Sequence, residues 1–357
     1  MNNYSLNQTK LTNEQIKIFN TINFNNKKKF EELLKKIFLQ TKEKNKKWMI
    51  SPLFSRDSLQ SKLFLDLNFL KLIDYYVKRK NLKIVYVENF FLKQIILNKY
   101  KNLNVFCNKN ILINFIVAFF QILNSALKII LFSGFMLLAK KKNRKKKFKN
   151  KKIILIETFF SKNLIINDQF KERYHKGLFK KLSKAQRKDC FFFPINLSIF
   201  YIFKFLRITK NEKINYLHLL DYLKIQDYFK SIFILPSLGK IDCKKIVFDQ
   251  YKIGIIINYY KFVSYFNESS FLANLNFHFL KRLKEEKIDI KLIIDWYENQ
   301  IIDKGLILGK NTFYPKTKIK GHVGFVNDFK NIHHYTPTKL EKKLKVLPDE
   351  VLIIIKA

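Results

Sequence analysis

Residues 111–139 are 29 mostly apolar positions in a row, and this stretch constrains the fold more than any other part of the chain. Its length is enough for one helix to cross a bilayer, which takes about 20 apolar residues. Five of its polar residues lie at spacings of 7, 3, 1 and 3, which place them on one face of a helix. They are Asn114, Gln121, Asn124, Ser125 and Lys128. We therefore expect either one membrane-associated helix with a narrow polar stripe or an apolar helical hairpin.

A basic segment follows this stretch directly. Ten of the thirteen residues from 140 to 152 are Lys or Arg, and an apolar helix beside such a segment is typical of proteins on anionic membranes. Three arrangements remain open: an interfacial or re-entrant helix, a spanning helix, and a buried pair of core helices. Spanning is disfavoured, because residues 1–110 carry 22 basic and 8 acidic side chains and would have to be translocated. The side chains expected to bind the membrane are Lys140, Lys141, Lys142, Arg144, Lys145, Lys146 and Lys147.

The formal net charge of +41 raises the question of nucleic acid. Of the 69 basic residues, 62 are Lys and seven are Arg, whereas nucleic-acid surfaces rely on Arg for bidentate contacts. Lys is enriched together with Asn, Ile and Phe, as an A+T-rich coding sequence would produce. We therefore expect an anionic membrane surface as a partner, and no nucleic acid.

The three cysteines, Cys107, Cys190 and Cys243, lie far apart without metal-ligand spacing, which favours a reducing compartment and predicts no metal site. The amino terminus is polar and has no signal-peptide core. No glycine-rich phosphate loop or nucleophile-elbow motif occurs, so dehydrogenases, P-loop proteins and α/β-hydrolases are disfavoured and no cofactor is expected. We expect a peripheral or monotopic protein at the cytoplasmic face of the inner membrane.

Short apolar segments alternate with helical patterns on both sides of the apolar stretch, which indicates an α/β fold with a Rossmann-like parallel sheet. We expect strands at 48–51, 83–87, 103–106, 153–157, 190–193, 288–295, 317–320 and 351–355. The chain then has four parts. They are a polar helical lead-in (1–45), the first part of the Rossmann-like domain (46–110), the apolar helix with its basic run (111–152), and the remainder of the domain (153–357).

Residues 288–309 carry the strongest chemical signal. An apolar strand ends there in Glu298, Asn299 and Gln300, which precede a helix. Because ligands bind outside the carboxyl ends of parallel strands, the Glu298 carboxylate would act as a general base or hold a hydroxyl group. The alternative is that Glu298 and Asn299 only cap the following helix.

Three segments in this order resemble motifs of the bacterial surface carbohydrate (O-antigen type) biosynthesis family. They are WMISPLFSRDSLQSKLF (48–64), ILIETFFSKNLIINDQFKERYHKGL (154–178), and WYENQIIDKGLILG (296–309) followed by FYPKTKIKGHVGF (313–325). That family is similar to two-domain Rossmann glycosyltransferases of the GT-B kind. The resemblance implies a glycosyltransferase that moves sugar from a nucleotide-sugar to a lipid-linked or saccharide acceptor without a metal.

The same resemblance implies roles for single residues. Glu298 would be the catalytic base, and the residues that would bind substrate are Asn299, Gln300, Arg173, Tyr174, Ser51, Arg56 and Ser61. The alternative for Arg173 is an ion pair with Glu172 or Asp168 on a helix surface. The alternative for the three residues between 51 and 61 is turn and cap chemistry.

The sequence departs from the family in one respect, because no donor-sugar domain with a glycine-rich diphosphate loop is recognisable. We expect the chain to be the acceptor portion of a carboxy-terminally truncated GT-B-like enzyme, inactive alone. It would bind a nucleotide-sugar only if a donor domain is supplied. The alternative is a non-catalytic membrane-surface scaffold or a basic RNA-binding or ribosomal protein.

Overall fold

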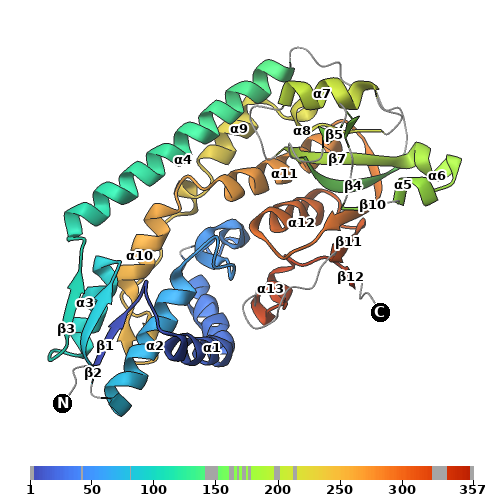
Figure 1. Ribbon diagram of the computed structural model, residues 1–357. Coiled ribbons are helices and arrows are strands. Elements are labelled where there is room, and N and C mark those ends of the chain that lie inside the picture. Colours follow the sequence, from blue (N-terminus) through green and yellow to red (C-terminus); the bar gives the residue numbers. More distant parts are fainter. Residues whose placement is uncertain are drawn as a thin grey trace. The chain divides into compact units, whose positions relative to one another are not determined.

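A computed structural model describes residues 4–41, 43–80, 82–140, 152–160, 165–166, 169–170, 174–175, 178–196, 202–211, 215–323 and 336–353 (Figure 1). The chain divides into two compact units, each built from three segments of sequence. Unit 1 comprises Met1–Ser125, Leu235–Asn267 and Asn327–Leu340. Unit 2 comprises Ala126–Ile234, Glu268–Val326 and Glu341–Ala357.

Unit 1 contains a parallel sheet of three strands in the order β1-β2-β3. The strands are β1 (Tyr4–Asn7), β2 (Leu82–Val87) and β3 (Asn104–Cys107). The helices are α1 (Asn13–Leu39), α2 (Leu63–Lys80), α3 (Phe90–Lys99) and α10 (Gly254–Val263), with 3₁₀ turns η1 (Lys46–Ile50), η2 (Pro52–Phe54) and η5 (Pro236–Leu238). The hairpin β8 (Val247–Phe248) and β9 (Tyr251–Lys252) completes the unit.

Local sequence accounts for several of these elements. Thr12 and Gln15 form a capping box at the start of α1, and the Asn89 side chain caps α3.

Contacts between residues distant in sequence also hold unit 1 together. The Asp74 carboxylate accepts hydrogen bonds from the Tyr251 and Tyr100 hydroxyls at 2.5 and 2.6 Å. These bonds join α2 to the end of α3 and to the β8–β9 hairpin.

Unit 2 contains a parallel sheet of five strands in the order β7-β4-β10-β11-β12. The strands are β4 (Lys152–Phe160), β7 (Cys190–Asn196), β10 (Asp289–Trp296), β11 (Lys318–Val323) and β12 (Glu350–Ile353). The helices in its segments include α7 (Ile202–Asn211), α8 (Leu219–Tyr222), α9 (Ile225–Ile232), α11 (Glu268–Glu285) and α12 (Ile301–Phe313). Shorter elements are α5 (Leu178–Lys181), α6 (Lys184–Asp189) and the hairpin β5 (Ile165–Ile166) and β6 (Gln169–Phe170). Helix α13 (Lys339–Leu344) precedes β12.

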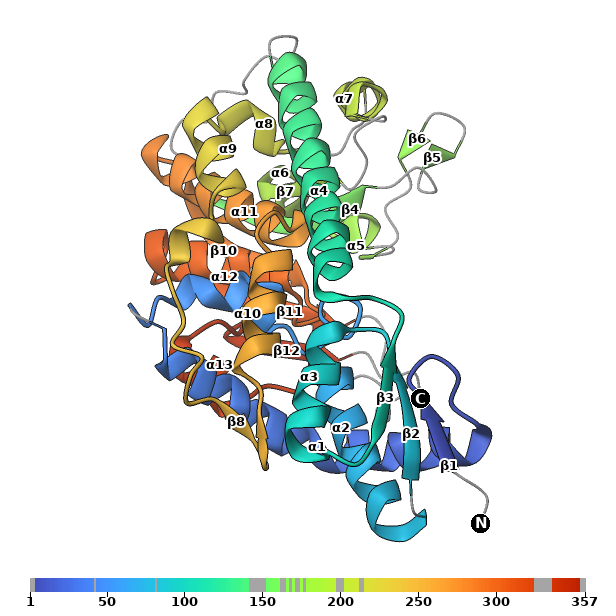
Figure 2. The same cartoon turned by 90° about the vertical axis from the view of Figure 1, so that its left-hand side faces the viewer.

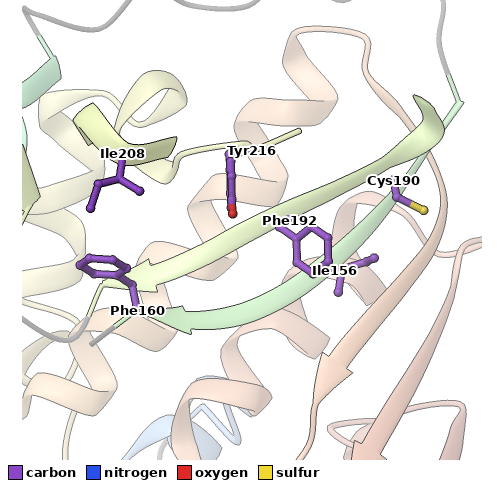
Figure 3. Packing of buried hydrophobic residues seen from close by; sticks show 6 residues of the cluster. All are labelled: Ile156, Phe160, Cys190, Phe192, Ile208 and Tyr216. Carbon is purple, nitrogen blue, oxygen red and sulfur yellow. The ribbon is translucent and has the colours of Figure 1, made fainter. Parts of the chain in front are cut away.

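A hydrophobic cluster of unit 2 packs against β4 and β7. Figure 3 shows side chains of β4 and β7 packed together with one from α7 and one from the segment before α8. The cluster comprises Ile156, Phe160, Cys190, Phe192, Ile208 and Tyr216. Residues 190–195 are all buried, as is typical of a parallel strand that is covered on both faces.

The fold class is α/β with parallel sheets, as expected. The expected strands, however, join two sheets instead of one, and β1 adds a strand from within the supposed helical lead-in. That strand is short and polar, so periodicity alone does not indicate it. Residues 48–51 were expected to form a strand, which is wrong. Residues 48–50 belong to the 3₁₀ turn η1, which Asn45 caps, and Ser51 connects it to η2.

Helix α4 (Ile111–Lys140) is one continuous helix, so the hairpin alternative is wrong (Figure 2). It is the helix among the described residues that is long and apolar enough to cross a membrane. Only 17% of the residues in its most apolar 18-residue stretch are buried. This low burial argues against a core helix. Its exposed apolar side chains include Ile111, Leu112, Ile113, Phe115, Ile116, Phe119, Phe120, Leu123, Leu127, Ile130, Leu131 and Leu138.

Candidate functional site

Glu298 follows β10 directly, at the carboxyl edge of the five-stranded sheet. The Trp296 indole Nε1 donates a hydrogen bond of 3.0 Å to its Oε1, and the Gln300 amide Nε2 donates one of 2.8 Å to its Oε2. Glu298 is half-buried. Among the described residues, each carboxylate oxygen thus has a donor that orients the group, and the residue keeps contact with solvent.

The turn between β10 and α12 is fixed by backbone conformation and by Asp303. Asn299 adopts a left-handed backbone with φ 54°, a conformation that Asn tolerates better than most residues. Oδ2 of Asp303 accepts the backbone N–H groups of Glu298 and Gln300 at 2.9 and 2.8 Å. Asp303 therefore caps α12, and the Glu298 side chain is not needed for that task.

Three buried carboxyl groups lie beneath this turn. Glu157 in β4, Asp295 in β10 and Asp303 in α12 each place a carboxylate oxygen within 4.8 Å of the others, and all three are at most 1% exposed. The parallel register pairs Ile156 with Ile294, which puts Glu157 beside Asp295.

The environment favours the neutral form of these carboxyl groups. Burial raises the pKa of Glu157 to about 8. Burial, reinforced by the nearby Glu157 carboxylate, holds the pKa of Asp295 well above its usual range. Burial does the same for Asp303, although the two backbone N–H groups oppose it. Oxygen ligands of this kind suit Mg²⁺ or Ca²⁺. Protons on the carboxyl groups would relieve the same repulsion between them.

Aromatic rings form a wall next to Glu298. The Trp296 ring lies edge-on to Tyr174 and to His322, with centroids 4.9 and 5.2 Å apart. His175 Nε2 lies 2.9 Å from the Glu157 carbonyl oxygen, which can only accept, so Nε2 carries the proton. Burial lowers the pKa of His175 to about 4, so its ring is neutral at pH 7.

The structure thus brings four of the expected residues together at one edge of unit 2: Glu298, Asn299, Gln300 and Tyr174. Arg173 lies outside the described residues. The sequence did not reveal Glu157, Asp295, His175 or His322 as members of the site. Glu157 and Asp295 could have been noticed in the sequence, because each is an acidic residue within an otherwise apolar strand.

The remaining three expected residues belong to unit 1, where each has a structural partner. Arg56 is buried and donates to the Thr336 carbonyl at 2.6 Å and to Glu31 at 3.3 Å. Ser51 caps η2 through the Leu53 N–H, and Ser61 accepts the Leu63 N–H at the start of α2. The contacts of Ser51 and Ser61 agree with the alternative of turn and cap chemistry.

Of the basic side chains expected at a membrane, Lys140 is described, and its Nζ donates to the Leu223 carbonyl at 2.6 Å. The other six lie outside the described residues: Lys141, Lys142, Arg144, Lys145, Lys146 and Lys147.

Comparison of the chain with protein-family models, with curated proteins and with solved structures finds no match in any of the three.

Proposed function

We propose that this chain takes part in glycosyl transfer at the cytoplasmic face of a membrane, in the synthesis of surface polysaccharide. The acceptor would be lipid-linked or saccharide, and Glu298 would take the proton of its attacking hydroxyl. The observation that carries the proposal is the position of Glu298, held by Trp296 and Gln300 at the carboxyl edge of a parallel sheet.

The strand order supports this location. In the order β7-β4-β10-β11-β12, the first strand in sequence, β4, has the second and third strands on its two sides. The order therefore reverses next to β4, and open α/β sheets of the Rossmann-like kind bind ligands outside the strand ends at such a reversal. Glu298 follows β10, which is the neighbour of β4 at this point.

The chemistry of the surroundings suits a sugar hydroxyl. A carboxylate that two donors orient can accept a hydrogen bond from a hydroxyl group and then its proton. The apolar face of a sugar ring can lie against an aromatic ring, and Trp296 and Tyr174 provide such rings beside the carboxylate. Following the family resemblance, we propose that a donor domain of the GT-B kind binds the nucleotide-sugar.

Helix α4 supports a membrane location for the reaction. Long exposed apolar surfaces mark interaction sites, and a bilayer interface accepts an apolar helix face together with basic neighbours. Basic residues outnumber acidic ones by 41 in this chain, which favours an anionic lipid surface over a neutral one.

The proposal can be tested with membranes from cells that lack this chain. Such membranes, given labelled nucleotide-sugars, should incorporate less label into the lipid-extractable saccharide fraction, and purified chain should restore it. Membranes from unaltered cells serve as the reference. Equal incorporation with and without the chain would contradict a role in glycosyl transfer.

A further inference from the structure

Unit 1 contains a cavity of about 310 Å³, to whose lining Glu298 and the residues around it do not contribute. This volume falls at the lower end of the range for small-molecule sites, about 300–1,000 Å³. Amide side chains are prominent in its wall: Gln8, Gln60, Asn89, Asn114, Gln121 and Asn267. Amides both donate and accept hydrogen bonds, so the wall suits a neutral ligand with many hydroxyl groups better than a simple ion.

A buried carboxylate reinforces this preference. Asp66 lines the cavity and is 3% exposed. Its Oδ1 accepts from Gln8 Nε2 at 2.8 Å, and its Oδ2 accepts from the Tyr260 hydroxyl at 2.6 Å. Each oxygen retains a lone pair for a further donor. A ligand hydroxyl that donates to Asp66 would make a charge-assisted hydrogen bond, the stronger kind.

Helix α4 links the cavity to the apolar surface. Asn114, Val117 and Gln121 line the cavity from successive turns of the helix. Ile113 and Phe120, the residues directly before the two amides, are 40% and 62% exposed. One segment of helix therefore offers hydrogen-bonding groups to the cavity and apolar side chains to the outside.

The rim of the cavity is open to solvent. Lys62 and Glu88 face each other there at 3.8 Å, with side chains 69% and 51% exposed. Leu59, also on the rim, is 92% exposed. A ligand can therefore enter past these exposed side chains.

From these observations we infer that the cavity binds the saccharide head group of a membrane lipid, whose acyl or prenyl chain lies along the apolar face of α4. This inference rests on the proposed function in that it assigns a site to the glycolipid acceptor. The cavity selects hydroxyl groups through Asp66 and the amides, and the helix selects an attached lipid chain.

Binding of the full chain to an array of immobilised mono- and disaccharides tests the inference. The wild-type chain should bind at least one saccharide. Asp66→Asn and Gln121→Leu should each weaken that binding by about tenfold or more, because each removes a cavity group. Asn124→Leu is the matched control, since Asn124 is an exposed amide of α4 that does not line the cavity. It should bind as the wild type does.

Thermal unfolding of each variant separates a lost site from a lost fold. If Asp66→Asn does not fold, the test depends on Gln121→Leu alone, because Gln121 is exposed. Binding of no saccharide by the wild-type chain, or equal binding by wild type and Gln121→Leu, would overturn the inference. Glu298→Gln should still bind saccharide. A wild-type chain that binds saccharide but does not restore glycosyl transfer to membranes lacking it would end the proposed function and leave this inference standing.

Discussion

The indole N–H of Trp296 donates a 3.0 Å hydrogen bond to the carboxylate of Glu298, two residues further along the chain. The last residue of β10 thereby orients the carboxylate that follows the strand. Because Trp296 is 5% exposed and its ring touches Tyr174, the donor has little freedom to move.

This relationship predicts the behaviour of Trp296→Phe, which keeps an aromatic ring but removes the N–H. A hydrogen bond to a charged group is worth about 1.5–3 kcal/mol, so we expect kcat to fall by about tenfold or more. KM for the acceptor should change little, because Trp296 acts through Glu298. Steady-state kinetics of glycosyl transfer would show this, and a variant with normal kcat would exclude a positioning role.

The buried carboxyl groups predict a pH-dependent stability. Between pH 4.5 and about 8, Glu157 is ionised in the unfolded chain and protonated in the folded one, since burial raises its pKa. The folded state then binds more protons, so stability falls as pH rises, by about 1.4 kcal/mol per pH unit for each such group. Glu157→Gln should flatten this fall and be more stable than wild type at pH 8, by about 1–3 kcal/mol.

Urea unfolding at pH 5, 6.5 and 8 measures this difference. Glu32→Gln, a change at an exposed glutamate of α1, should leave the pH profile of the wild type unchanged. Adding EDTA should have no effect if protons neutralise the cluster. A wild-type chain that Mg²⁺ stabilises strongly at pH 8 would show instead that the three carboxylates hold a metal.

The segment around Glu298 could be predicted from the sequence, because an apolar run that stops at polar residues marks the end of a buried strand. The contact between Glu157 and Asp295 could not. It depends on the register of β4 against β10, which contains an irregularity between Ile290 and Leu292, and a single sequence does not specify such a register.

The contact of Trp296 with His322 has the same origin, since the β10–β11 register pairs these two residues.

In the other unit, Leu6 is the only buried residue of β1, so this segment has too few apolar positions to indicate a strand. The helix over residues 111–140 was predictable, because a long apolar run with one polar stripe needs no tertiary contact to be recognised.

Two glycines in helices should respond in opposite ways to the same change. In Gly305→Ala, the new Cβ would overlap the backbone of Ala273, so α11 and α12 would have to separate. We expect a loss of about 1–3 kcal/mol in the free energy of unfolding. Gly134 in α4 has no atom within 4 Å of the position of a Cβ, so Gly134→Ala should gain up to about 1 kcal/mol from helix propensity. Equal effects in urea unfolding would contradict the close helix packing.

Helix α4 predicts vesicle binding. Changing Phe119, Leu127 and Leu131 together to Asn should weaken sedimentation with phosphatidylglycerol vesicles, since these side chains are 57%, 51% and 56% exposed and can insert into the lipid. The matched control changes three exposed apolar residues of α1 to Asn, namely Ile16, Phe24 and Leu39. The control should sediment as the wild type does, and loss of binding in both variants would refute a specific role for α4.

The most direct measurement is the initial rate of labelled sugar incorporation by membranes lacking the native chain, after addition of wild type, Glu298→Gln or Glu32→Gln. Glu298→Gln keeps the shape of the side chain but cannot accept a proton. We predict a rate lower by about 10²–10⁴-fold for this variant and a wild-type rate for Glu32→Gln. A rate for Glu298→Gln close to that of wild type would contradict the assignment of Glu298 as the base.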